Sequence, residues 1–338
     1  MDLNEFQYEL PSRLIAQHPC RERDQSRLMV VERSSGRIGH RTFRDLPDIL
    51  DAEDLVVLND TRVFPARLIG HKTTGARIEV FLLRQLGERR WEALVKPARR
   101  CPAGTCVIFE AGQFEGVVQE TVQREKRQIE FSWKSGELSS WISRVGQVPL
   151  PPYIQRPGEA SDRERYQTVF ARRSGSVAAP TAGLHFTAEV LARLDHCSIT
   201  LHVGYGTFRP VQCERIEEHR MDPEHYSIDE ETAKHIEDKK GSKGRIVAVG
   251  TTTTRTLEHL MRENGRILAG DGSTDLFIFP GFRFQAIDAL ITNLHLPGST
   301  LLMLVAAFAG KELVSEAYRE AIREEYRFYS YGDAMLIV

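Results

Sequence analysis

The chain has few of the features that mark specialised classes of protein. Its five cysteines are an odd number and form no C-x-x-C pair, which argues against a disulfide framework, a zinc ribbon or an iron–sulfur cluster. The longest apolar run, Leu301–Ala309, is about half the length that spans a bilayer. The acidic start, Met1–Glu5, lacks the basic and apolar segments of a secretory signal. We therefore expect a cytoplasmic protein with no membrane association.

The chain also lacks an excess of charge of either sign. Its 45 Lys and Arg residues face 47 Asp and Glu residues, so the net charge is only −2. Any contact with a nucleic acid must therefore come from a local patch. The length of 338 residues predicts two domains, or one large domain with an insertion.

Strands alternate with helices in both terminal parts of the chain. Apolar runs of buried-strand length occur at Leu55–Leu58, Ile246–Val249, Leu276–Phe279 and Ala289–Thr292, and a helix is expected at Thr254–Glu263. This alternation predicts an α/β fold with a mixed, largely parallel sheet flanked by helices.

A stretch in the middle of the chain has a different pattern. Residues 70–146 consist of short β-rich runs separated by Gly, Pro and charged turns, which predicts an inserted small β-barrel. The α/β catalytic domain is then discontinuous, with residues 1–69 and 147–338. Residues 71–148 hold 13 Lys and Arg against nine Asp and Glu, a difference of +4 that fits an RNA-contacting surface and equally a solvated one. The candidate phosphate contacts are Lys96, Arg99, Arg100, Arg124, Lys126 and Arg127.

Polar or glycine-rich segments interrupt the chain where five of the predicted strands end or begin. In α/β proteins this is where sites usually lie, so one broad site along a sheet edge would explain all five together. Each segment also has a purely structural alternative: an ion pair at Asn59–Arg62, a packed loop with a hydrogen-bonded histidine at Gly175–Thr187, a helix cap without a ligand at Val249–Arg255, and turns that satisfy their own backbone in the last two segments. The segments are Asn59–Arg62, Gly175–Thr187 with His202–Phe208, Val249–Arg255, Thr292–Thr300 and Tyr329–Asp333.

Two histidines in these segments, His185 and His295, are candidates for proton transfer near neutral pH. The carboxylate of Asp60, at a strand end, suits paired ribose hydroxyls, and Asp333 would bring a second carboxylate to the same edge. The threonine run Thr251–Thr254 offers caps and amide donors to an anion. The other predicted substrate-binding residues are Arg62, Thr181, Gly183, His202, Gly204, Tyr205, Gly206, Arg255, Ser299 and Tyr331.

One further polar group superficially resembles a metal site. His219, Asp222, Glu224 and His225 fit no standard zinc spacing, and Pro223 disfavours a helix that would present them together. We expect no metal.

Read together, the segments resemble the S-adenosylmethionine:tRNA ribosyltransferase-isomerase family of queuosine biosynthesis. The resemblance runs nearly from end to end, and the 13-residue stretch Gly175–Thr187 is its most specific part. The other similar stretches are Tyr8–Pro11, Leu14–Gln17, Arg23–Asp24, Ser26–Leu28, Leu58–Val63, Pro65–Leu68, Gly146–Ile154, Tyr166–Ala171, His202–Val211, Gly250–Thr252, Thr292–Gly310 and Ser330–Met335. The chain departs from the family at Asp222, where an H-x-M-H pattern has a second histidine, and at Leu294, where phenylalanine is usual.

The resemblance implies that S-adenosylmethionine is a consumed ribosyl donor and that no cofactor is needed. The expected partner is tRNA with 7-aminomethyl-7-deazaguanine at the wobble position, and the expected products are epoxyqueuosine-tRNA, adenine and methionine. It also implies an α/β domain with an inserted β-barrel, and we expect a monomer. The resemblance then implies that His185 and His295 transfer protons and that Asp60 or Asp333 holds ribose hydroxyls or the amine. Thr251–Thr254 would bind the methionine carboxylate. Arg62 and Arg255 would contact a carboxylate or the tRNA backbone.

Two other functions remain open. An S-adenosylmethionine-dependent RNA methyltransferase would share the donor and the α/β body, although no G-x-G-x-x-G loop follows the first strands. A non-catalytic tRNA-binding protein would use the basic barrel alone.

Overall fold

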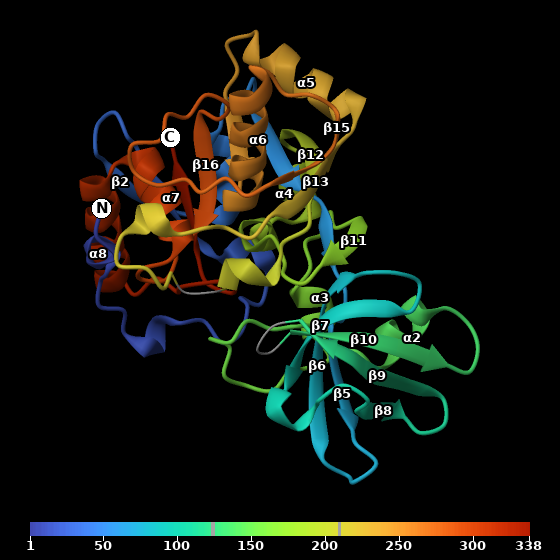
Figure 1. Ribbon diagram of the computed structural model, residues 1–338. Coiled ribbons are helices and arrows are strands. Elements are labelled where there is room, and N and C mark those ends of the chain that lie inside the picture. The colour runs from blue at the N-terminus through green and yellow to red at the C-terminus, as the bar shows by residue number, and fades with distance from the viewer. Residues whose placement is uncertain (123–125, 209–210) are drawn as a thin grey trace. The chain divides into compact units, whose positions relative to one another are not determined.

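The computed structural model describes residues 1–122, 126–208 and 211–338, which divide into two compact units (Figure 1). The α/β unit comprises Met1–Arg62, Pro151–Arg156 and Arg165–Val338, and the barrel unit comprises Val63–Leu150 and Pro157–Glu164. The predicted fold, a mixed α/β body with an inserted barrel, is confirmed. The barrel unit is wider than the expected 70–146, because its first strand, β5 (Arg67–His71), begins before residue 70.

Among the described residues, nine strands form the sheet of the α/β unit. β12, β3, β14 and β16 run parallel, as do β17 and β1, whereas the other neighbouring pairs are antiparallel. In sheet order the strands are β15 (Gly270–Thr274), β13 (Glu224–Ile228), β12 (Asp195–Leu201), β3 (Leu55–Asn59), β14 (Ile246–Val249), β16 (Ala289–Asn293), β17 (Ala334–Ile337), β1 (Arg27–Val31) and β2 (Ile38–Thr42).

The central strands are buried on both faces, which explains why they read as continuous apolar runs rather than alternating ones. Leu55 and Val57 of β3 pack into a core formed with α5, α6, α7 and α8, whereas Val56 and Leu58 pack into a second core formed with α1 and α4. The helices of the first core are α5 (Glu230–Lys240), α6 (Thr251–Asn264), α7 (Thr300–Ala309) and α8 (Lys311–Arg323), and those of the second are α1 (Leu46–Ile49) and α4 (Ala188–Leu191). Shorter elements are α3 (Asp162–Arg165), the 3₁₀ helix η6 (Thr181–His185) and a two-stranded sheet of β4 (Thr61–Val63) and β11 (Arg173–Ser176).

Two elements differ from the sequence prediction. The expected strand Leu276–Phe279 is wrong: Leu276 and Ile278 are buried in the core, but the strand that pairs with β13 is the preceding segment, Gly270–Thr274. Helix α6 begins at Thr251, three residues before its expected start at Thr254. The hydroxyls of Thr253 and Thr254 donate to the carbonyls four residues earlier, so these buried polar groups are satisfied inside the helix.

The barrel unit is a closed six-stranded barrel among the described residues, with the strand order β10-β7-β6-β5-β8-β9. Gly70 allows β5 to approach β8 closely, because a Cβ atom there would lie 2.7 Å from Cγ1 of Val107. Helix α2 (Leu138–Val145) belongs to this unit, and its Trp141 stacks on Phe114 with a centroid distance of 5.7 Å. The other strands are β6 (Arg77–Gln85), β7 (Arg90–Lys96), β8 (Cys106–Glu110), β9 (Phe114–Thr121) and β10 (Lys126–Trp133).

No helix within the described parts of the chain combines the length and apolar character that crossing a membrane requires.

Candidate functional site

The ends of several strands meet at one edge of the nine-stranded sheet. Because β12, β3, β14 and β16 are parallel, the segments that follow them leave the sheet on the same side. The segment before β17 joins them, because Asn293 at the end of β16 pairs with Ala334 at the start of antiparallel β17. The topology therefore brings segments from distant parts of the sequence to one edge.

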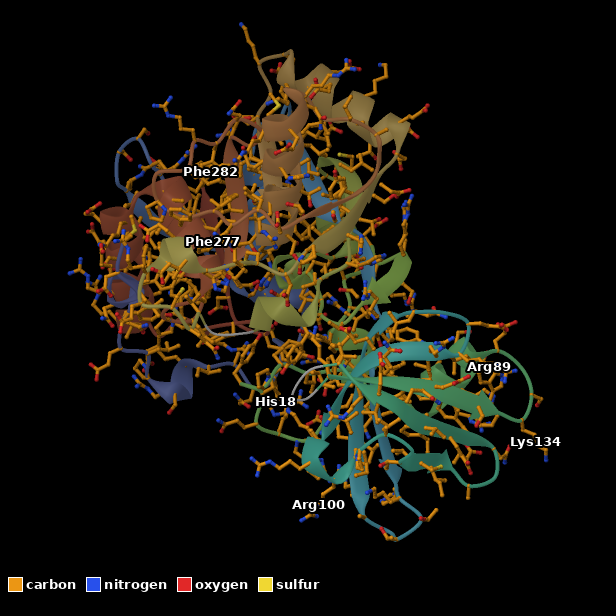
Figure 2. All side chains as sticks on the ribbon, viewed as in Figure 1. His18, Arg89, Arg100, Lys134, Phe277 and Phe282 are labelled. Atoms are coloured by element: carbon orange, nitrogen blue, oxygen red, sulfur yellow. The ribbon has the colours of Figure 1, made fainter. Side chains whose placement is uncertain are left out.

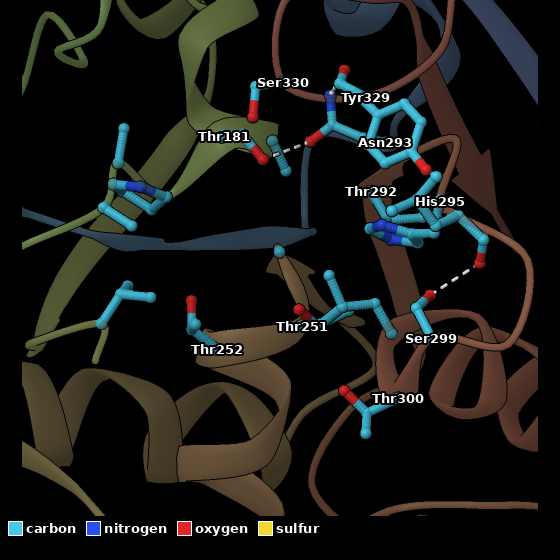
Figure 3. A pocket seen from close by; sticks show the side chains of 18 of the residues that line it. Thr181, Thr251, Thr252, Thr292, Asn293, His295, Ser299, Thr300, Tyr329 and Ser330 are labelled. Carbon is cyan, nitrogen blue, oxygen red and sulfur yellow. Dashed lines mark hydrogen bonds between the residues drawn. The ribbon is translucent and has the colours of Figure 1, made fainter. Parts of the chain in front are cut away.

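A cavity of about 460 Å³ opens at this edge, within the size range of sites for small ligands (Figure 3). No Asp, Glu, Lys or Arg is among the described residues that line it. Its lining is neutral, with hydroxyl, amide and imidazole groups interspersed among apolar ones. The polar side chains are those of Tyr153, Thr181, Thr251, Thr252, Thr292, Asn293, His295, Ser299, Thr300, Tyr329 and Ser330.

The N-terminus of α6 faces the cavity without a side-chain cap. Its N-cap residue is Gly250, at φ 88°, and a glycine has no side chain to accept from the first helical N–H groups. Thr251 and Thr252 line the cavity, whereas Thr253 and Thr254 do not. The hydroxyls of Thr253 and Thr254 donate instead to the carbonyls of Val249 and Gly250, at 2.8 and 3.1 Å. Only the first half of the predicted threonine run therefore offers groups to a ligand.

Helix α7 begins at the same cavity but caps itself. The Oγ of Ser299 accepts a hydrogen bond from the backbone N–H of Leu302 at 3.2 Å and donates to the carbonyl of Leu296 at 2.8 Å. Of the α-helices α6 and α7, α6 is thus the one whose first N–H groups have no side-chain acceptor and remain for an anion.

His295 lines the cavity and is held firmly in place. Its Nε2 lies 2.7 Å from Oγ1 of Thr292, and its backbone N–H donates to the Tyr318 hydroxyl at 2.9 Å. The hydroxyl of Tyr8 donates to the backbone carbonyl of His295. Burial lowers the pKa of His295 to about 3, so the imidazole is neutral at physiological pH. Its Nδ1 forms no hydrogen bond with the residues that the structure describes.

His185 lies behind the cavity wall rather than in it. Its Nδ1 is 2.7 Å from Oγ of Ser26, and its Nε2 is 3.1 Å from Nδ2 of Asn293, a residue that does line the cavity. The Oδ1 of Asn293 accepts from the Thr181 hydroxyl at 2.8 Å. Burial, and then the charges of Arg23 and Arg327, lower the pKa of His185 to about 3. Both ring nitrogens of this neutral imidazole are occupied.

The carboxylate of Asp333 binds backbone N–H groups. Its two carboxylate oxygens accept from the N–H groups of Arg27 and Arg327, at 2.9 and 2.7 Å, and only 2% of the residue is exposed. Burial raises its pKa. Tyr331 is also buried, and it lines a small cavity of about 20 Å³ together with His185. Neither residue lines the main cavity, which is the cavity of about 460 Å³.

Asp60 and His202 lie together but away from the main cavity. The Thr200 hydroxyl donates to Oδ1 of Asp60 at 2.5 Å, and Oγ1 of Thr61 is 2.8 Å from Nδ1 of His202. Burial lowers the pKa of His202. His202 lines a second, more open cavity of about 550 Å³ beside β13 and β15, and Arg62 is exposed on β4.

Arg255 takes part in a buried ion pair. Its Nη1 donates to Oε2 of Glu224 at 2.5 Å, and its Nε donates to the carbonyl of Leu276 at 2.7 Å. The other carboxylate oxygen of Glu224 accepts from the backbone N–H of Gly204 at 2.9 Å. The pair therefore anchors the segment that follows β12, and the guanidinium does not reach the main cavity.

The remaining predicted residues of the α/β unit belong to close packing rather than to the cavity lining. A Cβ at Gly183 would lie 2.8 Å from Cζ of Phe170, and one at Gly206 would lie 2.6 Å from Oδ2 of Asp222. Tyr205 is half-buried in the short helix η7 (Tyr205–Phe208). Within the parts that the structure describes, no group of three or more His, Cys, Asp or Glu is placed to hold a metal ion.

The predicted RNA contacts on the barrel fall into different environments. Lys96, Arg99 and Arg100 are exposed, whereas Arg127 is 5% exposed and donates to the carbonyls of Ala98 and Cys101. Lys126 pairs with Glu92 at 3.2 Å. Figure 2 shows Arg100 on one side of the barrel and Arg89 and Lys134 on the other. Arg124 lies outside the described residues.

Six polar residues of the cavity wall were not predicted as site residues, although five of them lie in the predicted segments Thr292–Thr300 and Tyr329–Asp333. They are Tyr153, Thr292, Asn293, Thr300, Tyr329 and Ser330. Asn293 could have been predicted, because it directly follows the apolar run of β16, as Asn59 follows that of β3. No strand-end signal marks Tyr153, whose ring meets that of Tyr329 at a centroid distance of 4.3 Å although the two residues are far apart in the chain.

Known proteins are similar to this chain along nearly its whole length. A family model described as queuosine biosynthesis protein matches residues 3–337. The S-adenosylmethionine:tRNA ribosyltransferase-isomerases of Pelobacter propionicus and Geobacter metallireducens are 52% and 50% identical to this chain, and each alignment covers 100% of both chains. The crystal structure of an S-adenosylmethionine tRNA ribosyltransferase from Thermotoga maritima is similar with a TM-score of 0.57 and 39% identity, covering 99% of this chain and 100% of that one.

Proposed function

This chain belongs to the queuosine biosynthesis protein family of S-adenosylmethionine:tRNA ribosyltransferase-isomerases, and we propose that it transfers and isomerises the ribosyl part of S-adenosylmethionine onto tRNA. The acceptor is the aminomethyl group of 7-aminomethyl-7-deazaguanine at the wobble position. The products are epoxyqueuosine-tRNA, adenine and methionine. S-Adenosylmethionine is a consumed substrate, and the reaction uses no further cofactor.

The observation that carries this proposal is the neutral cavity with an uncapped helix N-terminus in its wall. The N–H groups at the start of α6, with the hydroxyls of Thr251 and Thr252, suit the methionine carboxylate. No Lys or Arg is among the described lining residues, so no fixed positive charge there repels the sulfonium. The paired rings of Tyr153 and Tyr329 supply the aromatic surface that attracts a cation.

The same neutrality favours the nucleophile. A primary amine attacks only when it is uncharged, and burial disfavours the ammonium form unless a carboxylate stabilises it. The described lining contains no carboxylate. The cavity therefore lowers the pKa of a bound amine and leaves its lone pair available.

We assign the removal of the C5′ hydrogen to His295. Its Nδ1 has no partner in the described part of the chain, and the ring is neutral and held by Thr292. Burial makes an added positive charge costly in the empty cavity. With S-adenosylmethionine bound, however, the sulfonium already brings that charge, and deprotonation moves it from the ligand to the imidazole. The transfer creates no net charge in the cavity.

The test is incubation with S-adenosylmethionine and tRNA that carries the aminomethyl-deazaguanine base, followed by nucleoside mass spectrometry. We expect conversion to epoxyqueuosine with release of adenine and methionine. Addition of a methyl group with formation of S-adenosylhomocysteine would instead identify a methyltransferase. Binding of tRNA without consumption of S-adenosylmethionine would identify a non-catalytic protein.

A further inference from the structure

Tyr329 has a buried hydroxyl group with no partner among the described residues. The residue is 6% exposed, and its hydroxyl oxygen makes no hydrogen bond with any residue that the structure describes. Tyr329 lines the cavity beside Asn293 and His295, as Figure 3 shows. A buried hydroxyl without a partner destabilises the unliganded protein, because it has given up its bonds to water and gained none. Phenylalanine would fill the same space without this cost.

The backbone of Tyr329 is also strained. Its φ of 73° lies in the left-handed region, where a bulky side chain is a genuine outlier. The conformation is held by bonds on both sides: the N–H donates to the carbonyl of Leu294 at 3.0 Å, and the carbonyl accepts from the N–H of Gly332 at 2.9 Å. Such strain concentrates at functional sites, where the surrounding structure imposes it.

The ring of Tyr329 is fixed by its neighbour. Tyr153 packs against it with a centroid distance of 4.3 Å and an interplanar angle of 32°, and the Tyr153 hydroxyl is itself bonded to Oγ of Ser330. Of the two tyrosine hydroxyls at this wall, one is therefore satisfied and the other has no described partner. A fixed ring with an unsatisfied hydroxyl is preorganised to bind a polar atom of a ligand.

We propose that the Tyr329 hydroxyl is a substrate-binding group that forms a hydrogen bond with the nucleoside part of bound S-adenosylmethionine. The inference rests on the proposed function, since that function places this donor in the cavity. Tyr329 lies in the wall with Asn293 and His295, across the cavity from Thr251 and Thr252, the proposed carboxylate site (Figure 3). The nucleoside part of the same molecule then occupies the space beside Tyr329.

The test is a pair of tyrosine-to-phenylalanine variants, with S-adenosylmethionine binding measured by calorimetry in the absence of tRNA. Tyr329→Phe keeps the ring and its packing on Tyr153, and should weaken binding by about tenfold, the typical effect of one hydrogen bond. Its melting temperature should equal or exceed that of the wild type, because the variant removes a buried hydroxyl without a partner. Tyr166→Phe is the matched control: Tyr166 is also a buried tyrosine, but it does not line the cavity, so the affinity of this variant should not change.

Each other result would overturn the proposal in a recognisable way. Wild-type affinity in Tyr329→Phe would show that the hydroxyl contacts no part of the donor. A reduction confined to tRNA affinity would assign the contact to the acceptor base. A lowered melting temperature together with unchanged affinity would assign the hydroxyl a structural role. A wild-type protein that binds no S-adenosylmethionine would remove the proposed function itself and this inference with it.

Discussion

The Nδ2 atom of Asn293 lies 3.1 Å from Nε2 of His185, and this contact determines which nitrogen of the imidazole carries the proton. Because the amide Oδ1 accepts from Thr181, the amide nitrogen is the donor toward His185, whose Nε2 must then be unprotonated. The proton is on Nδ1, which donates to Ser26, and the Ser26 hydroxyl donates to the carbonyl of Arg23. Each hydrogen bond in the series from Thr181 to the carbonyl of Arg23 then has one donor and one acceptor. His185 thus orients the amide of Asn293 toward the cavity as a positioning residue.

The first prediction concerns this pair. His185→Ala should lower the single-turnover rate of adenine release by about 10²-fold, because a misplaced cavity group costs that much even without a direct role in chemistry. Asn293→Ala should have a similar effect. If His185 acts through Asn293, the double variant should be no slower than Asn293→Ala alone. Effects that multiply in the double variant would instead support an independent proton transfer by His185.

The second prediction concerns His295. His295→Gln should lower the single-turnover rate by about 10²–10⁴-fold, the usual contribution of a positioned proton-transfer group. The affinity for S-adenosylmethionine should change far less, because the proposed carboxylate contacts at α6 remain. His196→Gln is the control, since His196 is exposed on β12 and bonded only to the carbonyl of Leu194 among the described residues. A His295→Gln enzyme with near-normal turnover would remove this role.

The third prediction separates the exposed from the buried cations of the barrel. The logarithm of the affinity for tRNA falls linearly with the logarithm of the salt concentration. Replacing Lys96, Arg99 and Arg100 by alanine should make this slope shallower by about 0.7–0.9 for each phosphate that the protein no longer neutralises. The double variant Arg89→Ala/Lys134→Ala, on the other side of the barrel in Figure 2, should leave the slope unchanged. Equal slopes for all variants would show that these side chains are only solvated charge.

Arg127 should behave differently from these exposed cations. Its guanidinium is buried against backbone carbonyls, so Arg127→Met should mainly destabilise the barrel rather than flatten the salt dependence. The protein's three tryptophans, Trp91, Trp133 and Trp141, all lie in the barrel unit, so their fluorescence reports its unfolding directly. A variant with normal barrel stability but a reduced salt slope would contradict this assignment.

The fourth prediction is a decrease of stability in acid. Burial lowers the pKa of both His185 and His295 from 6.5 to about 3, whereas in the unfolded chain both regain the ordinary value. The unfolded state therefore binds more protons between these values, so their contribution to stability is complete above about pH 6.5 and declines as the pH falls. Each histidine should lower the unfolding free energy by about 1.4 kcal/mol per pH unit in this window.

Urea unfolding followed by far-ultraviolet circular dichroism at about pH 7.5 and about pH 5.5 measures this decrease. His185→Gln and His295→Gln should each reduce the difference between the two conditions, whereas His196→Gln should not. An unchanged pH dependence in both buried variants would show that other groups cause the acid sensitivity.

The sequence by itself determined the architecture and the sheet edge at which the cavity opens. Continuous apolar runs such as Leu55–Leu58 specify strands buried on both faces, and the polar residues that end them mark the sheet edge at which α/β proteins usually bind ligands. The change of pattern in the middle of the chain determined the barrel. These features depend on the spacing of residues along the chain, which is local information.

Only the tertiary structure decided which polar groups face the cavity. His185 and His295 both lie in strand-end segments, yet one has both ring nitrogens occupied and the other lines the cavity with no described partner for Nδ1. Asp333 and Arg255 are satisfied by backbone groups and by Glu224, whereas the Tyr329 hydroxyl has no described partner. The physical reason is that a polar group can serve a ligand only if the fold has not already paired it, and its partners come from neighbouring elements that are distant in the sequence.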